Sequence, residues 1–86
     1  MPLTFELVTP ERAVLSTEAY LVELPGSAGD MGVFAGHSPL MTTIRDGEVR
    51  VYPSAGAAPQ RVTVTGGFAE IDAGRVTVLA EQATAA

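Results

Sequence analysis

Apolar and polar side chains alternate with a period of two along much of this 86-residue chain. The pattern is clearest in residues 60–65, where valines alternate with arginine and threonine, and it returns in residues 75–79 and 48–52. Successive side chains of a β-strand point to opposite faces, so each segment has one apolar face and one polar face. This arrangement is typical of antiparallel strands with one face on a core and the other in water. The pattern predicts an all-β chain.

Turn-forming residues separate these segments at short intervals. Asp46-Gly47 lies between the predicted strand segments at residues 42–44 and 48–50 and predicts a tight hairpin. Residues 72–74, Asp-Ala-Gly, predict a three-residue hairpin, and Gly66-Gly67 predicts a turn that needs a positive φ. Many short strands with regular turns indicate a sandwich or a barrel.

Residues 11–24 also have a helical interpretation, because Glu, Arg, Ala and Leu tolerate a helix. Their apolar positions do not form a helical stripe, so we predict a turn at Ser16-Thr17 and then a strand over residues 18–24, ended by Pro25-Gly26. Residues 54–59 are small and predict a loop. Residues 81–86 are compatible with a helix but are far below the roughly 12 residues that an isolated helix needs.

Composition excludes several classes of function. A chain of 86 residues has room for one domain with a small core. The absence of Cys excludes disulfides and cysteine-ligated zinc, and the absence of Lys excludes lysine-linked carriers and Schiff-base enzymes. One histidine cannot build a multi-histidine metal site, so neither a metal nor a cofactor is expected. A net charge of −5 makes nucleic acid an unfavourable partner.

The chain also lacks features of membrane insertion and export. No apolar run approaches the roughly 18 residues that a membrane-spanning helix needs. The N-terminus has neither the basic region nor the long apolar core of a signal peptide. We therefore expect a soluble, cytoplasmic domain without a membrane span.

The candidates for chemistry are few. Histidine is the common catalytic base near neutral pH, but His37 would need both a serine hydroxyl and a carboxylate beside it. Ser38 adjoins it, but neighbours in extended chain point apart, and only Asp30 could approach. A histidine hydrogen-bonded in a surface loop is the favoured interpretation. Gly26, Gly29 and Gly32 fit no nucleotide fingerprint, and Glu70 and Asp72 flank a hairpin, where solvated charge is ordinary. No catalytic residue is therefore expected.

The stretch from residue 26 to residue 44 is glycine-rich, almost uncharged and apolar. We expect a loop that either folds over the end of the core, through Val33, Phe34 and Leu40, or faces a partner. The residues alone favour an interaction module over an enzyme, and they name no partner.

Residues 29–47, Gly-Asp-Met-Gly-Val-Phe-Ala-Gly-His-Ser-Pro-Leu-Met-Thr-Thr-Ile-Arg-Asp-Gly, resemble the epsilon subunit of F-type ATP synthases. That family typically shows Gly-acidic-x-Gly-apolar, then His-x-Pro-Leu and a turn at Gly. Residues 64–71, 76–81 and 7–12 are similar to further family segments, and the resemblance runs in one register over about residues 3–81. It implies a ten-stranded, antiparallel β-sandwich over residues 1–81, followed by a short tail over residues 82–86.

The resemblance implies a non-catalytic subunit of the central stalk, a rotor part that binds the gamma subunit and the membrane c-ring. It would help couple proton flow to ATP synthesis, as a peripheral component at the cytoplasmic face of the bacterial inner membrane. Carried over by position, the implied c-ring contacts are Gly29, Asp30, Met31, Gly32 and His37. The implied gamma contacts are Pro39, Leu40, Met41, Thr42 and Thr43.

The sequence departs from the family after the last predicted strand. Members usually continue with a helical hairpin of roughly 40–50 residues, which carries inhibitory movement and, in some members, an ATP site. Neither role is assigned to this chain, and no small-molecule ligand is expected. Two alternatives stay open, a free-standing β-sandwich binding module and a small hydrolase using His37.

Overall fold

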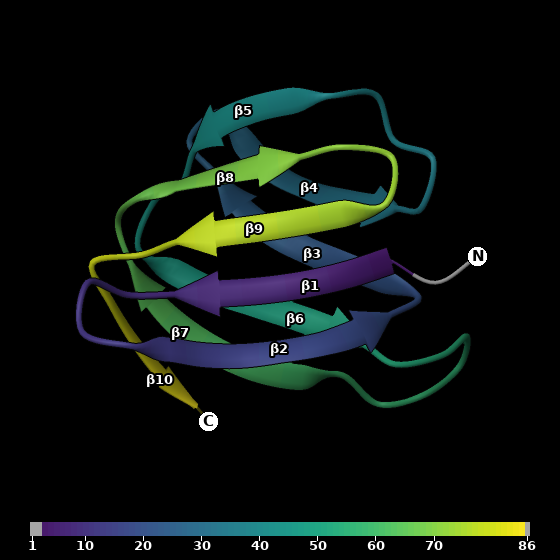
Figure 1. Ribbon diagram of the computed structural model, residues 1–86, viewed down its shortest axis with the longest axis horizontal. Coiled ribbons are helices and arrows are strands. Elements are labelled where there is room, and N and C mark those ends of the chain that lie inside the picture. Colours follow the sequence, from purple (N-terminus) through teal and green to yellow (C-terminus); the bar gives the residue numbers. More distant parts are fainter. Residues whose placement is uncertain (1–2, 86) are drawn as a thin grey trace.

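The alternating segments form ten β-strands in the computed structural model, which describes residues 3–85 (Figure 1). In chain order the strands are β1 Leu3–Val8, β2 Ala13–Ala19, β3 Leu21–Gly26, β4 Gly29–Phe34, β5 Leu40–Thr43, β6 Gly47–Tyr52, β7 Gln60–Thr65, β8 Phe68–Ile71, β9 Arg75–Leu79 and β10 Gln82–Ala85. The described residues contain no helix, and therefore none that could cross a membrane. The all-β prediction is confirmed.

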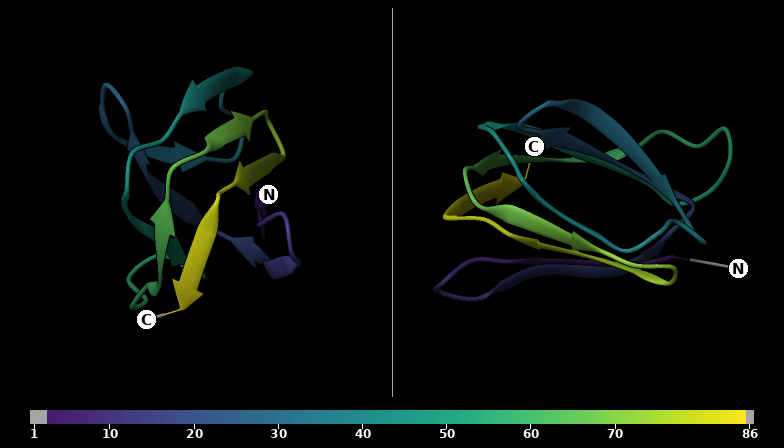
Figure 2. Two further views of the ribbon diagram at one scale, coloured as in Figure 1. Left: turned by 90° about the vertical axis from the view of Figure 1, so that its left-hand side faces the viewer. Right: turned by 90° about the horizontal axis from the view of Figure 1, so that it is seen from above.

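The strands build two five-stranded sheets that lie face to face (Figure 2). The first sheet has the order β2-β1-β9-β8-β5, and the second has the order β10-β7-β6-β3-β4. The paired strands are antiparallel except for β1 and β9, which are parallel. Parallel neighbours need a long connection, and here the seven intervening strands supply it. The predicted ten-stranded sandwich is confirmed, with one parallel pair that the pattern did not indicate.

The core lies between the two sheets, where the inward side chains of each strand meet. β1 shows the alternation most clearly, because Leu3, Phe5 and Leu7 are fully buried while Thr4 and Glu6 are only half-buried. Full burial of a Val, Leu or Phe side chain contributes about 1.5–3 kcal/mol. The described residues bury no polar or charged side chain, so the apolar contact between sheets holds the sandwich together.

Residues 16–24 differ from the prediction of a turn followed by one strand. Ser16 and Thr17 lie within β2, and the chain passes from the first sheet to the second at Tyr20. The backbone N–H of Tyr20 donates a 2.7 Å hydrogen bond to the carbonyl of Tyr52 in the second sheet. Ala19 and Val22 are both buried although they are three residues apart. This break in the period of two was the available signal for a change of sheet.

Pro25 and Gly26 are the last two residues of β3, rather than the turn that ends it. The predicted hairpin at Asp46-Gly47 is also wrong. It joins β5 of the first sheet to β6 of the second, and these strands do not pair. An Asp-Gly pair favours a sharp change of direction, but it does not specify whether the chain returns along the same sheet. Asp46 Oδ1 instead accepts a 2.8 Å hydrogen bond from Gly66 N, tying two crossings together.

The predicted three-residue hairpin over residues 72–74 is confirmed. β8 and β9 pair in antiparallel register with Ile71 opposite Val76. Asp72 Oδ1 accepts a 3.0 Å hydrogen bond from Gly74 N, which satisfies the turn locally.

The end of the sandwich extends beyond the predicted boundary at residue 81. Gln82–Ala85 forms β10, which pairs with β7 from Gln82 opposite Thr65 to Ala85 opposite Val62. The segment does not need to be stable as an isolated strand, because it pairs with the backbone of β7 and Ala83 packs against the core. The predicted tail is therefore a strand up to residue 85, and residue 86 lies outside the described residues.

Gly66 and Gly67 have φ values of 56° and 108°, which confirms the predicted positive φ at this turn. Gly67 is also restricted by space, because a Cβ there would overlap the carbonyl oxygen of Leu79. Glycine is thus required both for backbone conformation and for the close approach of the β9–β10 connection.

We expect Gly67→Ala to lower the free energy of unfolding by roughly 2–4 kcal/mol, because it adds backbone strain and a steric overlap. Gly74→Ala is the matched control, since its φ is not positive and nothing lies within 4 Å of the added methyl. The control should change stability by less than about 0.5 kcal/mol in urea denaturation. Equal losses in the two variants would contradict the role given to Gly67.

Candidate functional site

The uncharged stretch of residues 26–44 is not one loop. It contains β4, which pairs with β3 at the edge of the second sheet, and β5, which pairs with β8 at the edge of the first. Both edge strands lie on the same side of the sandwich, at the top of Figure 1. Val33 belongs to the core, whereas Phe34 and Leu40 are exposed and do not fill it.

The tip of the β3–β4 hairpin is bonded to the end of β5. Gly26 forms a β-bridge with Ile44, and Ser27 N donates a 3.0 Å hydrogen bond to the carbonyl of Thr43. The hydroxyls of Ser27 and Thr43 are 2.6 Å apart. These contacts join the two sheets at one corner, so the implied c-ring contacts on β4 adjoin the implied gamma contacts on β5.

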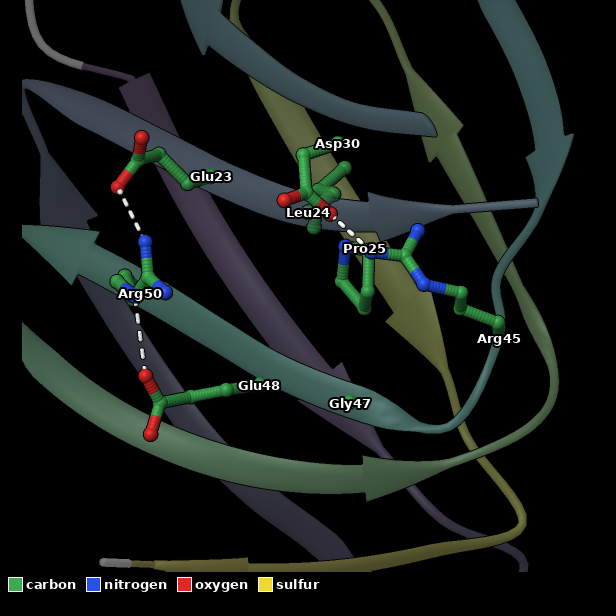
Figure 3. Close-up of a pocket in the computed structure, with 8 residues that line it drawn as sticks. All are labelled: Glu23, Leu24, Pro25, Asp30, Arg45, Gly47, Glu48 and Arg50. Carbon is green, nitrogen blue, oxygen red and sulfur yellow. Dashed lines mark hydrogen bonds and ion pairs between the residues drawn. The ribbon is translucent and has the colours of Figure 1, made fainter. Parts of the chain in front are cut away.

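Asp30 is paired within the chain. Arg45 Nη2 donates to Asp30 Oδ1 (Figure 3). Arg45 Nη1 donates to the carbonyl of Gly26. The Asp30 side chain is 73% exposed and that of Arg45 is 48% exposed, and such pairs add only about 0–1 kcal/mol of stability. Sequence reasoning missed Arg45 as a site residue because 15 positions separate the partners and no local pattern joins them.

The other implied c-ring contacts differ in their surroundings. Gly29 has a φ of 143°, a conformation that favours glycine, and Gly32 is exposed on β4 opposite Glu23. Met31 lies opposite Leu24 and packs half-buried against the core, so little of its side chain is accessible.

His37 lies half-buried in the segment that connects β4 to β5. Its Nδ1 is 2.7 Å from the carbonyl oxygen of Ser38, which can only accept, so this nitrogen carries the proton in that hydrogen bond. The hydrolase alternative needs the ring beside a serine hydroxyl and a carboxylate, whereas this bond goes to the backbone. Among residues 3–85, no three potential metal-binding side chains gather.

The implied gamma contacts occupy Pro39 and the edge strand β5, and they adjoin the exposed side chain of Phe68 on β8. Leu40, Met41 and Phe68 are 42%, 62% and 39% exposed, and we call these three residues the β5–β8 patch. Leu40 lies at the sheet edge opposite the buried Ile71, so it does not share the face of Met41. Met41 lies opposite Glu70 and Thr43 opposite Phe68, which places all four on the outer face of the first sheet.

An apolar groove continues this outer face. Phe68 pairs with Leu79, and both line the groove together with Val8 and Pro10. Sequence reasoning did not select these residues. Large apolar side chains at outward positions of alternating strands, such as Phe68 and Leu79, were the signal that could have found them.

A row of charged side chains crosses the outer face of the second sheet (Figure 3). Arg50 Nε donates a 3.0 Å hydrogen bond to Glu48 Oε1, and its Nη1 lies 3.4 Å from Glu23 Oε1. Tyr52 donates a 2.6 Å hydrogen bond to the same oxygen of Glu23, and Arg61 lies 3.7 Å from Glu48. Sequence reasoning did not predict this network, although its members occupy outward positions of β3, β6 and β7.

The network raises the pKa values of two of its members, Arg50 and Tyr52. Hydrogen bonds to Glu48 and then to Glu23 raise the pKa of Arg50 above its ordinary value. The hydrogen bond to Glu23, followed by desolvation, raises the pKa of Tyr52. Both shifts follow from donors that face carboxylates.

Comparisons with known proteins agree on one family. Residues 2–86 match the model described as "ATP synthase, Delta/Epsilon chain, beta-sandwich domain". The ATP synthase epsilon chain of Parvibaculum lavamentivorans is 51% identical over 79 residues, which cover 92% of this chain and 59% of that one. The ATP synthase epsilon chain of Caulobacter vibrioides is 45% identical over 84 residues, which cover 98% of this chain and 95% of that one. This chain therefore spans about three fifths of one relative and almost the whole of another.

Two solved structures show the same fold at low sequence identity. A chain of the Euglena gracilis mitochondrial ATP synthase, from a structure titled with OSCP, F1 and c-ring, superposes with a TM-score of 0.88 at 22% identity. The match covers 98% of this chain and 53% of that chain. A chain from the central stalk and c-ring of the Tetrahymena thermophila enzyme gives 0.77 at 9% identity, covering 98% and 66%.

We expect the phenol of Tyr52 to titrate above its ordinary value of about 10 in a Tyr20→Phe chain, where Tyr52 is the only tyrosine. Adding Glu23→Gln should lower that midpoint, because the carboxylate acceptor is lost. Ultraviolet absorbance of the tyrosinate measures both midpoints. Since the folded-state pKa is raised, the stabilisation by this hydrogen bond is complete below about pH 10 and is lost as the pH rises through the folded-state pKa. If Glu23→Gln left the titration midpoint of Tyr52 unchanged, the result would contradict the proposed effect of Glu23 on the pKa of Tyr52.

Proposed function

The chain belongs to the ATP synthase delta/epsilon chain β-sandwich family, and we propose that it is a non-catalytic rotor subunit that docks the gamma subunit to the c-ring. In this role it helps couple proton flow to ATP synthesis, as a peripheral part of the enzyme at the cytoplasmic face of the bacterial inner membrane. The observation that carries the proposal is the corner where Ser27 bonds Thr43, because it joins the two implied contact sets into one side of the sandwich.

The proposed c-ring contact is the hairpin tip with Gly29, Asp30 and Gly32, together with the accessible parts of Met31 and His37. Asp30 presents a largely exposed carboxylate at this tip. Complementary charge at an interface sets register and orientation more than affinity. A polar loop with a basic side chain is therefore the partner chemistry that this surface fits.

The proposed gamma contact is Pro39, Thr42 and Thr43 together with the β5–β8 patch. Exposed apolar side chains beside polar strand residues resemble the centre and rim of a protein interface. The groove through Phe68 and Leu79 extends this surface on the same sheet. An apolar contact of this kind supplies affinity, while the hairpin tip supplies register.

The proposal includes no catalytic residue, metal or cofactor in this chain. His37 bonds a backbone carbonyl, so the geometry gives the hydrolase alternative no oriented base. No observation in the structure favours the other alternative, a free-standing binding module. Co-purification from solubilised membranes separates the two, since a rotor subunit carries the gamma, alpha and beta subunits with it and a free-standing module does not.

We expect Asp30→Asn to lower the ratio of proton pumping to ATP hydrolysis in membrane vesicles by roughly 2- to 10-fold, which corresponds to a loss of about 0.5–1.5 kcal/mol at an interface hydrogen bond. Glu18→Gln is the matched control. It removes the same charge from an exposed position on β2, at the opposite edge of the first sheet from β5. An unchanged ratio in Asp30→Asn, with the chain still assembled, would contradict the c-ring assignment.

We expect Met41→Glu to weaken binding of the gamma subunit by roughly 10- to 100-fold, because it places a charge in the centre of an apolar contact. Its side chain is exposed, so the isolated chain should keep its thermal midpoint. Ala55→Glu, in the exposed β6–β7 loop, introduces the same charge away from the patch and should bind normally. Titration calorimetry with purified gamma subunit measures the dissociation constants of the unchanged chain, Met41→Glu and Ala55→Glu. Equal affinity of these three chains for the gamma subunit would reject the proposed surface.

A further inference from the structure

Arg45 holds the β3–β4 hairpin from the other side of the corner. Its backbone N–H donates a 2.9 Å hydrogen bond to the carbonyl of Pro25, and its two Nη atoms donate to Gly26 and Asp30. Figure 3 shows the guanidinium reaching from the β5–β6 connection toward the hairpin. The residue lies outside both contact sets that the resemblance implies.

The hairpin tip is built around two glycines, which restrict the backbone less than other residues do. Gly26 and Gly29 close it around Ser27 and Ala28, and Gly29 adopts a φ of 143°. Gly26 fits tightly, since an added Cβ would lie 2.6 Å from the carbonyl oxygen of Gly29. β4 is an edge strand that pairs only with β3. No second neighbouring strand restrains the backbone freedom that its glycines allow. Contacts from outside the hairpin are therefore needed to fix the Asp30 carboxylate.

The guanidinium geometry suits that task. A planar fork of donors can bind a carboxylate and a carbonyl at the same time, which fixes direction as well as distance. Arg45 bonds Oδ1 of Asp30, and the hydrogen bonds of the described residues include none to Oδ2. Glu23 and Glu48 line the same hollow and already pair with Arg50, and Glu48 also lies near Arg61, so without Arg45 the Asp30 carboxylate would lose its own cation beside two further carboxylates.

We propose that Arg45 is a positioning residue that orients the Asp30 carboxylate, holding Oδ1 and leaving Oδ2 for a basic or N–H donor of the partner loop. The inference rests on the proposed function, because it assigns a role inside the proposed c-ring contact. It predicts that loss of Arg45 acts through Asp30. The two residues should then fail as a unit rather than additively.

The test measures the ratio of proton pumping to ATP hydrolysis for the assembled enzyme, and the thermal midpoint of the full chain. Arg45→Met should lower the ratio by about as much as Asp30→Asn, and the double variant should be no worse than either. The midpoint should fall by less than about 8 °C, since the pair is exposed. Arg61→Met is the matched control, because Arg61 is exposed on β7 and outside the proposed contact, and it should keep the wild-type ratio.

The charge-swapped chain Asp30→Arg with Arg45→Asp separates positioning from structure. It re-forms an ion pair at the hairpin, so the midpoint should recover, but it presents a guanidinium where the partner needs a carboxylate, so the ratio should stay low. Recovery of both quantities would reduce Arg45 to a structural role and overturn the inference. A normal ratio in Arg45→Met beside a low ratio in Asp30→Asn would overturn the inference alone. A normal ratio in Asp30→Asn would overturn the proposed c-ring contact and the inference together.

Discussion

Two apolar sheet faces press against each other across the whole molecule, and this contact leaves no room for polar groups between them. Side chains such as Phe5, Val22, Val49 and Val78 meet there, and the described residues bury no polar or charged side chain. Burial of this kind stabilises a small domain only if nearly every inward position contributes to it. Every charged or chemically active group is therefore displaced to an outer face, an edge or a connection, and the candidate surfaces are found at all three.

The candidate binding groups depend more on the connections between the sheets than on the strands. The chain changes sheet repeatedly, and several crossings are closed by a hydrogen bond to the other sheet or to another crossing, such as Tyr20 to Tyr52 and Gly66 to Asp46. The crossing from β5 to β6 contains Arg45, which forms an exposed ion pair with Asp30 of β4. Loops on a rigid scaffold are common places for binding groups. In this protein the sandwich supplies that rigidity, and the corner between β3, β4 and β5 carries residues of both proposed contacts.

The local patterns predicted features that depend on few neighbours. Alternation predicted the strands, and Gly66-Gly67 predicted a backbone with positive φ. The patterns failed where a choice between sheets was involved. The strand over residues 18–24 is two strands in different sheets, Asp46-Gly47 turns a corner rather than a hairpin, and residues 82–85 complete a sheet. In each case the local sequence is compatible both with the predicted arrangement and with the observed one. Only packing against the rest of the chain decides which sheet the segment joins.

The period of two and the regular turns therefore predicted, without any structure, an all-β sandwich or barrel with alternate residues inward, because strand geometry alone places alternate side chains on opposite faces. The resemblance in residues 29–47 indicated the family and implied the residues of the proposed contacts. The folded structure decided which strands share a sheet and that Asp30 faces Arg45. It also paired β5 with β8, so that Met41 and Phe68 share the outer face of the first sheet. These last features join residues 15 or more positions apart, or from different strands, and such contacts exist only after both sheets have assembled.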